Sequence, residues 1–268
     1  MAGRKMAGRM KLAASAAALL LTACIPSEIR APVANQEAGR DVVRFGEVSF
    51  TELRPGVWQH TTYLDLMGFG PVPSNGLLVV DGESSLLVDT AWTDAQTAQI
   101  LRWAAEVLGK PVRAAVVTHA HQDKMGGIGA LTAAGIPSWA NPLSNELAPQ
   151  NDLLPAINAL AFDAQGWAIG AGETALAPLK IYFPGGAHTR DNITVGLPDI
   201  GLAFGGCMIK ASDAPTLGNL ADADTSAYAR SVRNFAAAFP DAGLIVMSHS
   251  PPEGRRAIAR SLELAEEL

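Results

Sequence analysis

The sequence predicts an α/β fold in which β-sheets are stacked and helices cover the outside. Two observations carry this prediction. Of the 268 residues, 49% are hydrophobic, which is enough to bury a sizeable core. From about residue 47, short apolar runs typical of strands alternate with helical patterns, in two halves of similar size. Because such layers bury their apolar faces against each other, and because no linker separates the halves, we predict one domain.

The elements of the first half are predicted from their apolar patterns and the turn residues between them. Successive strands are predicted over residues 48–53, 57–64, 76–80 and 85–90. A helix is predicted over 93–108, because Thr93 or Asp94 can cap it and its apolar residues share one face. A buried strand follows over 113–119, and a second helix is predicted to begin near Met125.

The second half repeats this arrangement. Strands are predicted over residues 179–183, 193–197, 201–206 and 244–249. Helical patterns cover 225–239 and 253–265. Strands followed by a helix in both halves favour two stacked sheets with the helices outside.

The N-terminal segment is predicted to be removed rather than folded. Residues 12–23 form an apolar run that is too short to span a bilayer and follows the basic residues Arg4, Lys5, Arg9 and Lys11. The run ends in LTAC, residues 21–24, which resembles the bacterial lipobox. Lipoproteins of that kind are cleaved before the cysteine, which then carries the lipid. An ordinary signal peptide that ends near a cysteine is the alternative.

We therefore expect a signal peptide over 1–23, a polar tether over 24–44 and a folded domain over 45–268. Lipid on Cys24 would hold the protein in the periplasm, at the outer membrane, and is the only membrane association expected. We expect a monomer. The net charge of −6, with no cluster of basic residues, argues against nucleic acid as a partner.

Metal-capable side chains follow four of the predicted strands. In open layered folds, ligands bind beyond the carboxyl ends of strands. Imidazole, thiolate and carboxylate are all good zinc ligands, so three histidines would make one open site and Asp, Cys and His a second. The residues that lie at these strand ends are His119, His121, Asp123, His188, Cys207 and His249.

The segment THAHQDKMGG, residues 118–127, leaves two geometries open. If its backbone stays extended, His119, His121 and Asp123 project together, because alternate side chains point the same way. If the chain turns after Ala120, they face two adjacent ions instead. The chain has five histidines, and we interpret the fifth, His60, as an ordinary core or surface residue. With Cys24 lipidated, Cys207 is a lone thiol, which an oxidising compartment tolerates when it is buried or bound to metal.

HAHQD together with His188, Cys207 and His249 resembles the metallo-β-lactamase family, in the form of its subclass B1. DNITVG, AFGGCMIK, LGNLADADT and IVMSHS extend the resemblance over nearly the whole chain. It implies an αβ/βα four-layer sandwich, with two mixed β-sheets packed face to face and helices outside. It also implies two zinc ions, the first on His119, His121 and His188 and the second on Asp123, Cys207 and His249. It also implies that a metal-bound hydroxide hydrolyses the β-lactam amide of penicillins, cephalosporins and carbapenems, which gives antibiotic resistance.

Other site residues come from the same resemblance. Asp123 and Asn219 are the expected catalytic residues, with the Asn219 side chain stabilising the oxyanion, and Lys210 is expected to bind the substrate carboxylate. Asp89 is expected to steady the metal ligands from behind. Taken alone, Lys210 would be a solvated lysine, Asn219 a turn residue and Asp89 a capping or turn residue. Gln122 and Lys124 are expected to lie on the loop surface.

A Gly/Pro-rich hairpin over residues 63–76 is expected to form a lid over the substrate. Trp92 is expected to form the wall of the substrate site that faces this lid. The alternative for the hairpin is a turn that packs against its own side chains. The apolar residues expected to contact substrate are Leu64, Leu66, Phe69 and Val72. Residues that depart from the relatives resembled, and that bear on substrate range, are Met67, Pro71, Pro73, Arg190, Asp213 and Pro215.

Three rival functions are weighed against this one. A thioester hydrolase of the same superfamily needs a histidine directly after the acid, where this chain has Lys124. A serine β-lactamase needs S-x-x-K, and no serine here has a lysine three residues later. A lipoprotein that only sequesters zinc would favour closed coordination, whereas these donors leave an open position on each ion.

Overall fold

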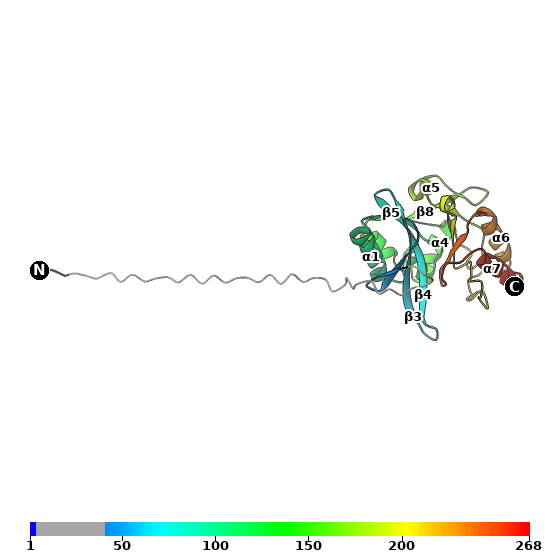
Figure 1. Cartoon of the computed structure of the whole chain (residues 1–268), viewed down its shortest axis with the longest axis horizontal. Coiled ribbons are helices and arrows are strands. Elements are labelled where there is room, and N and C mark those ends of the chain that lie inside the picture. Colours follow the sequence, from blue (N-terminus) through cyan, green and yellow to red (C-terminus); the bar gives the residue numbers. More distant parts are fainter. Residues whose placement is uncertain (4–40) are drawn as a thin grey trace.

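Four layers, in the order helices, sheet, sheet, helices, make up the computed structural model of the protein (Figure 1). The structure describes residues 1–3 and 41–268. The expected cleavage site, the lipidated Cys24 and nearly all of the tether lie outside the described residues. The α/β sandwich with two mixed sheets that the sequence predicts is confirmed.

The first sheet has eight strands in sequential order among the described residues. The strands from β1 to β5 pair antiparallel, and those from β5 to β8 pair parallel, which makes the sheet mixed. Their bounds are β1 Val42–Phe45, β2 Val48–Arg54, β3 Val57–Leu66, β4 Gly70–Asp81, β5 Ser84–Val88, β6 Val112–Val116, β7 Ser138–Ala140 and β8 Asn158–Ala159.

Helices cover the outer face of this sheet. Helix α1, Asp94–Arg102, begins where predicted, because the Thr93 side chain accepts a hydrogen bond from the Gln96 N–H. It continues as a π-helix, η1, over Trp103–Val107. The other elements before the second sheet are α2 Gln122–Met125, α3 Ile128–Ala133, α4 Pro142–Leu147, η2 Ala148–Asn151, β9 Ala161–Phe162, β10 Ala168–Ile169 and α5 Ala171–Leu176.

The second sheet has four strands in the order β11-β12-β13-β14 among the described residues. Two antiparallel pairs and a parallel one, β13 with β14, make it mixed as well. Helices α6 and α7 cover its outer face, on the opposite side of the molecule from α1 (Figure 1). The bounds are β11 Lys180–Tyr182, β12 Thr194–Leu197, η3 Pro198–Ile200, β13 Leu202–Gly206, α6 Tyr228–Ala238, β14 Leu244–Met247 and α7 Arg256–Glu266.

The period-2 alternation of the strands separates three apolar layers. In β4, Leu77 and Val79 face the second sheet and pack with Phe204 and Val246, whereas Leu78 faces α1. The layer between α6, α7 and the second sheet has its own core. Each sheet is therefore buried on both faces, which explains why its central strands read as continuous apolar runs.

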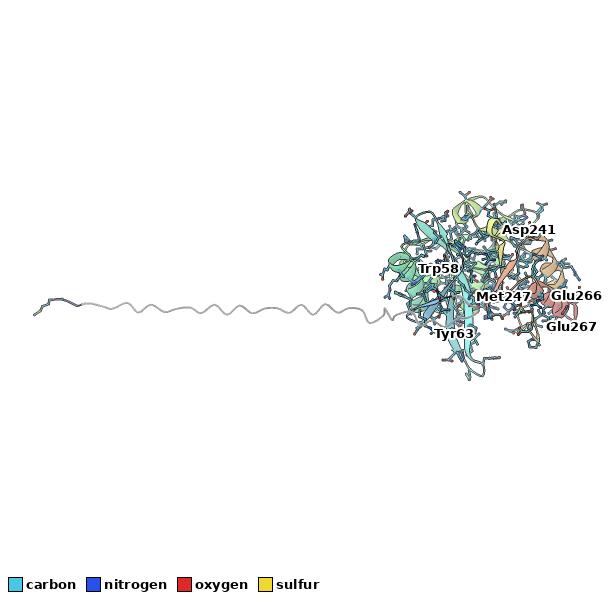
Figure 2. The ribbon with its side chains drawn as sticks, in the orientation of Figure 1. Trp58, Tyr63, Asp241, Met247, Glu266 and Glu267 are labelled. Atoms are coloured by element: carbon cyan, nitrogen blue, oxygen red, sulfur yellow. The ribbon has the colours of Figure 1, made fainter. Side chains whose placement is uncertain are left out.

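Strands β3 and β4 form a long hairpin that extends beyond the sandwich (Figure 1). Leu66 pairs with Gly70 at its tip, and Tyr63, labelled in Figure 2, lies on the arm that leaves the body. Gly68 and Gly70 have φ of +86° and +72°, in the region where a side chain would be strained. These glycines allow the tight turn that projects the tip into solvent.

The structure differs from the predicted elements in several places. Helix α2 ends at Met125, where a helix was predicted to begin, and α3 follows it, while β4 begins at Gly70 instead of residue 76. Strand β1 begins at Val42 and pairs with β2, so the boundary expected at residue 45 falls inside a strand. The segment from α4 to α5 carries short elements for which no strand or helix was predicted. Within the described ranges, 1–3 and 41–268, no helix has both the length and the apolarity to cross a membrane.

Candidate metal centre

The HAHQD segment bends beyond the end of β6 and then enters helix α2. The bend covers residues 119–121, and His121 occupies the cap position before α2 with φ −112° and ψ 158°. Asp123 follows in the first turn of the helix. The chain therefore turns between His119 and Asp123, as in the second of the two predicted geometries.

The three histidines predicted for one site converge. The His119 Nε2 and His121 Nδ1 atoms lie 3.2 Å apart. The His188 ring centroid lies 5.1 Å from that of His119 and 5.3 Å from that of His121. One nitrogen from each ring falls within 4.8 Å of the others, a spacing that fits one metal ion with three imidazole ligands.

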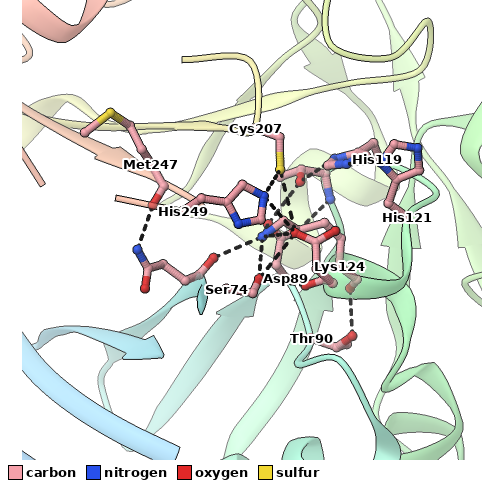
Figure 3. A network of polar contacts seen from close by, with 12 residues as sticks. Ser74, Asp89, Thr90, His119, His121, Lys124, Cys207, Met247 and His249 are labelled. Atoms are coloured by element: carbon pink, nitrogen blue, oxygen red, sulfur yellow. Dashed lines mark hydrogen bonds and ion pairs between the residues drawn. The ribbon is translucent and has the colours of Figure 1, made fainter. Parts of the chain in front are cut away.

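The donors predicted for the second site also meet, although they come from three distant segments. Cys207 Sγ lies 3.2 Å from His249 Nε2 and 3.7 Å from Asp123 Oδ2. The third pair, His249 Nε2 and Asp123 Oδ2, is 3.5 Å apart. His249 Nδ1 lies 2.7 Å from the Pro73 carbonyl oxygen, so this nitrogen donates and Nε2 is left for a metal. Figure 3 shows Cys207, His249 and His119 converging.

The two donor groups adjoin. Ligand atoms of His119, Asp123 and Cys207 also lie within 4.8 Å of one another, so His119 is within reach of both groups. The closer pairwise distances favour His249 as the third member of the second group. Three imidazoles beside a thiolate, a carboxylate and an imidazole form a donor set that fits two neighbouring zinc ions.

Burial and neighbouring charges bring His119, His188, Asp123 and Cys207 into the form that binds metal, whereas the charges of Cys207 and Asp123 raise the pKa of His249 against the effect of its burial. Burial lowers the pKa of His119 to about 4 and that of His188 to about 3, so both rings are neutral at pH 7. Burial opposes ionisation of Asp123 and Cys207, yet nearby positive charges lower the pKa of both groups well below the usual range. Neutral imidazole, carboxylate and thiolate are the forms that metal binding requires.

Lys124 lies in the interior, and the expectation that it belongs to the loop surface is wrong. Its side chain is 0% exposed, and Nζ lies 3.1 Å from Asp123 Oδ2 and 3.6 Å from Asp89 Oδ2. Nζ also donates to Ser74 Oγ and to the Asn75 carbonyl oxygen. Burial disfavours the ammonium, but the carboxylates and Cys207 outweigh it and raise the Lys124 pKa. Gln122, its neighbour, is exposed as expected.

Asp89 lies directly behind the donors, fully buried at the end of β5. Its Oδ1 accepts from the Thr118 N–H at 2.7 Å and its Oδ2 from Thr118 Oγ1 at 3.0 Å. Thr118 precedes the ligand His119, so Asp89 fixes the strand end that presents it. The φ of Asp89 is +61°, a strained value for a residue with a side chain. Burial raises its pKa to about 7, although Lys124 and Thr118 work against this rise.

His60 is a core residue, as interpreted from the sequence. It is 1% exposed, and its ring lies against the backbone of Val88 and Asp89. A Cβ at Gly76 would lie 2.3 Å from His60 Nε2, so only glycine fits opposite the ring. Burial, followed by the charge of Lys124, lowers the pKa of His60 to about 3.

Lys210 and Asn219 lie close to each other near the donors. Lys210 is half-buried, and a Cβ at Gly218 would be 3.8 Å from its Nζ. Asn219 is exposed, and its Oδ1 accepts from the Ala221 N–H at 3.1 Å. The turn role considered for Asn219 is therefore present, and it uses the side-chain oxygen and not the Nδ2 group. The roles of both residues toward substrate stay predictions.

The apolar residues of the hairpin differ in exposure. Leu64, Leu66 and Val72 are half-buried, whereas Phe69 is 84% exposed at the tip. Trp92 is 6% exposed and its Nε1 is buried without a partner. Trp92 therefore presents at most an edge to a ligand, whereas the tip has apolar surface available for one.

Two acidic residues near the donors were not singled out from the sequence. Asp191 Oδ2 accepts from the Ala120 N–H at 2.8 Å and from Ser144 Oγ at 2.7 Å, which fixes the backbone between His119 and His121. Asp222 Oδ2 lies 3.1 Å from His121 Nε2. The sequence signal for both residues is weak, because each is a single acidic residue near predicted metal ligands and belongs to no ligand motif of its own.

Comparisons with known proteins agree with this geometry. A family model described as the metallo-beta-lactamase superfamily matches residues 69–249. The metallo-beta-lactamase type 2 of Bacteroides fragilis is 32% identical over 225 residues, which cover 82% of this chain and 86% of that protein. This chain belongs to the metallo-β-lactamase superfamily.

Solved structures with this fold include close relatives. A metallo-β-lactamase from Erythrobacter litoralis, with beta mercaptoethanol in its active site, has 74% sequence identity and a TM-score of 0.84, and covers 85% of this chain and all of its own (100%). FIM-1 from Pseudomonas aeruginosa, in its mono-zinc form, has 48% identity and a TM-score of 0.79, and covers 82% of this chain and 95% of its own.

Proposed function

We propose that this protein hydrolyses β-lactams at a centre of two zinc ions, one in each donor group, and that its substrates are penicillins, cephalosporins and carbapenems. Its reaction class is that of its relatives: the chain is a zinc-dependent β-lactam hydrolase and confers antibiotic resistance. The observation that carries the proposal of two ions is the convergence of two adjoining donor groups from both halves of the chain.

His119, His121 and His188 would hold the first ion, and Asp123, Cys207 and His249 the second. Bound zinc supplies a nucleophile at neutral pH, by acidifying water, and polarises the carbonyl that is attacked. Two divalent cations outweigh the two anionic donors, so the loaded centre is positive and favours an anionic substrate.

Lys210 and Asn219 would orient the substrate. The Lys210 ammonium, half-buried beside Gly218, would bind the carboxylate next to the lactam nitrogen in a charge-assisted hydrogen bond. The Asn219 Nδ2 group would donate to the carbonyl oxygen as negative charge develops on it. Asp123, held by Lys124 at 3.1 Å, would keep its carboxylate aimed at the second ion.

Substrate range would depend on the hairpin and on the loops around the centre. The exposed Phe69 and Met67 at the tip would cover the apolar substituents of the antibiotic. Pro71 and Pro73 restrict the β4 arm, because proline fixes φ. Arg190, Asp213 and Pro215 are exposed and would tune affinity for charged substituents rather than the reaction itself.

We further propose that the protein is a periplasmic monomer that lipid on Cys24 anchors to the outer membrane. The LTAC motif after a basic and apolar segment supports this proposal. Cell fractionation tests it: the wild type should sediment with the outer membrane, and Cys24→Ser should move to the soluble fraction. A Cys24→Ser variant that stays with the membrane would contradict the lipid anchor.

The test of the proposed function is hydrolysis of a carbapenem, a cephalosporin and a penicillin by the fragment that starts after Cys24. Turnover should stop with EDTA and return when two equivalents of zinc are added. Full turnover with one equivalent would contradict the two-ion proposal while leaving the reaction class intact. Two bound zinc ions without turnover of any of the three would favour a thioester or lactone hydrolase or a zinc-sequestering protein.

A further inference from the structure

Asp222 contacts a predicted metal ligand from outside the donor group. Its Oδ2 lies 3.1 Å from His121 Nε2, and the other ring nitrogen, Nδ1, lies 3.2 Å from His119 Nε2. The ring of His121 is thus placed between a carboxylate on one side and the first donor group on the other.

This placement selects one tautomer of the ring. A carboxylate only accepts hydrogen bonds, so the proton of neutral His121 belongs on Nε2, where it is donated to Asp222. The lone pair of Nδ1 is then directed at the first donor group. Carboxylates that hold metal-binding histidines in this way fix both the tautomer and the ring orientation.

Asp222 also belongs to the loop that carries Asn219. Asn219 Oδ1 accepts from the Ala221 N–H, one residue before Asp222. Two residues after it, the Asp224 N–H donates to the Ala187 carbonyl oxygen at 2.9 Å, next to the ligand His188. The loop is therefore tied to the first donor group at two points, through His121 and beside His188.

We propose that Asp222 is a positioning residue of the metal centre. It holds His121 with Nδ1 toward the first metal, from the loop that also carries Asn219. This inference rests on the proposed three-histidine zinc site, so its test must report metal binding as well as activity.

The exposure of Asp222 sets the size of the effect. Its side chain is 62% exposed, and exposed ion pairs contribute little to the stability of a fold. Loss of an outer partner of a metal-ligating histidine, in contrast, costs roughly 10–100-fold in metal affinity. Because water can replace part of the contact, we expect a loss of zinc affinity at the lower end of this range, about tenfold, at the first site.

The experiment compares Asp222→Ala, Asp222→Asn and the control Asp213→Ala, which removes another exposed acid from the stretch between Lys210 and α6. Zinc affinity is measured by competition with a chromophoric chelator, and cobalt substitution separates the sites, since only the second contains the Cys207 thiolate and its charge-transfer band. Asp222→Ala should lower first-site affinity about tenfold, with the charge-transfer band and the stability of the metal-free protein unchanged. Asp222→Asn keeps an acceptor oxygen and should lose less.

Nitrogen-15 NMR of the zinc-loaded wild type should find His121 protonated on Nε2. Equal affinities in Asp222→Ala and Asp213→Ala would overturn the proposal. The proposal would also be overturned if Asp222→Ala lowered the zinc affinity of both sites equally and made the metal-free protein less stable. Asp222 would then have only a structural role. If the wild-type protein binds no metal through the three histidines, the proposed metal centre itself is wrong. This outcome is seen in the wild type alone and is therefore distinct from failure of the Asp222 proposal.

Discussion

Lys124 Nζ lies 3.1 Å from Asp123 Oδ2 in an interior where neither side chain is more than 7% exposed. A second carboxylate, Asp89, lies 3.6 Å away and is fully buried. One buried ammonium thus compensates the acid that is expected to bind metal and the acid that fixes Thr118. Figure 3 shows Lys124 beside the second of these acids, Asp89. Without it, two carboxyl groups would share a site from which water is excluded.

We expect Lys124→Met to destabilise the metal-free protein by about 3–5 kcal/mol, because removal of one partner leaves buried charge uncompensated. Urea unfolding of the chelated protein measures this. The matched control is Lys110→Met, which breaks a pair with the exposed Glu83 and should cost less than about 1 kcal/mol. Equal losses of stability in the two variants would show that the buried ion pair contributes no more to stability than the exposed one.

Cys207→Ser should reduce the zinc content from two ions to one. Serine keeps the size of the side chain but offers a hydroxyl where the second donor group has a sulfur atom 3.2 Å from His249 Nε2. Activity should fall by more than the roughly 100-fold that loss of an outer partner can cost. Elemental analysis and steady-state kinetics report the two effects. A variant with two zinc ions and full turnover would show that the ligand assignment is wrong.

Lys210→Ala should raise KM for anionic β-lactams with a smaller change in kcat. A charge-assisted hydrogen bond contributes about 1.5–3 kcal/mol, so the rise should be about tenfold or more. Lys180→Ala, at an exposed position on β11, is the control and should leave both constants unchanged. A drop in kcat alone would mean that Lys210 acts in the chemical step and not in docking of the carboxylate.

Acid sensitivity of the metal-free protein should depend on His60. Its pKa is about 3 in the folded chain against an ordinary 6.5, so between these values the unfolded chain binds a proton that the native chain does not. Stability therefore falls as the pH falls below 6.5, by up to about 1.4 kcal/mol per pH unit from this group. From pH 6.5 to 5, the wild type should lose up to about 2 kcal/mol more than His60→Gln. Parallel urea-derived profiles for the two proteins would rule this contribution out.

The sequence predicted the donors because strand ends are readable from apolar runs. His119, Cys207 and His249 each follow such a run, and loops at strand ends converge whatever their lengths. The layer order followed from the same runs. Strand β1 was missed because its four residues lie at the end of a polar segment, and pairing with β2 rather than local pattern makes them a strand.

The sequence could not place side chains that act through tertiary contacts. Lys124 follows two ligands in a polar stretch and looked like surface, yet the turn into α2 directs its ammonium inward to Asp89. Asp222 reaches His121 across 101 residues of sequence, a contact that no local pattern encodes. Conversely, the turn role that was the alternative for Asn219 could be predicted, since an Asx turn is local. Its role toward substrate stays a prediction.

Both donor groups take residues from the two halves of the chain: His119, His121 and Asp123 come from one half, and His188, Cys207 and His249 from the other. Zinc bound there would clamp one sheet to the other and add its binding free energy to folding. A chelator given with an antibiotic would therefore do more than stop turnover. It would weaken the packing of the two sheets against each other and make the chain more susceptible to cellular proteases. The amount of enzyme in each cell would then fall.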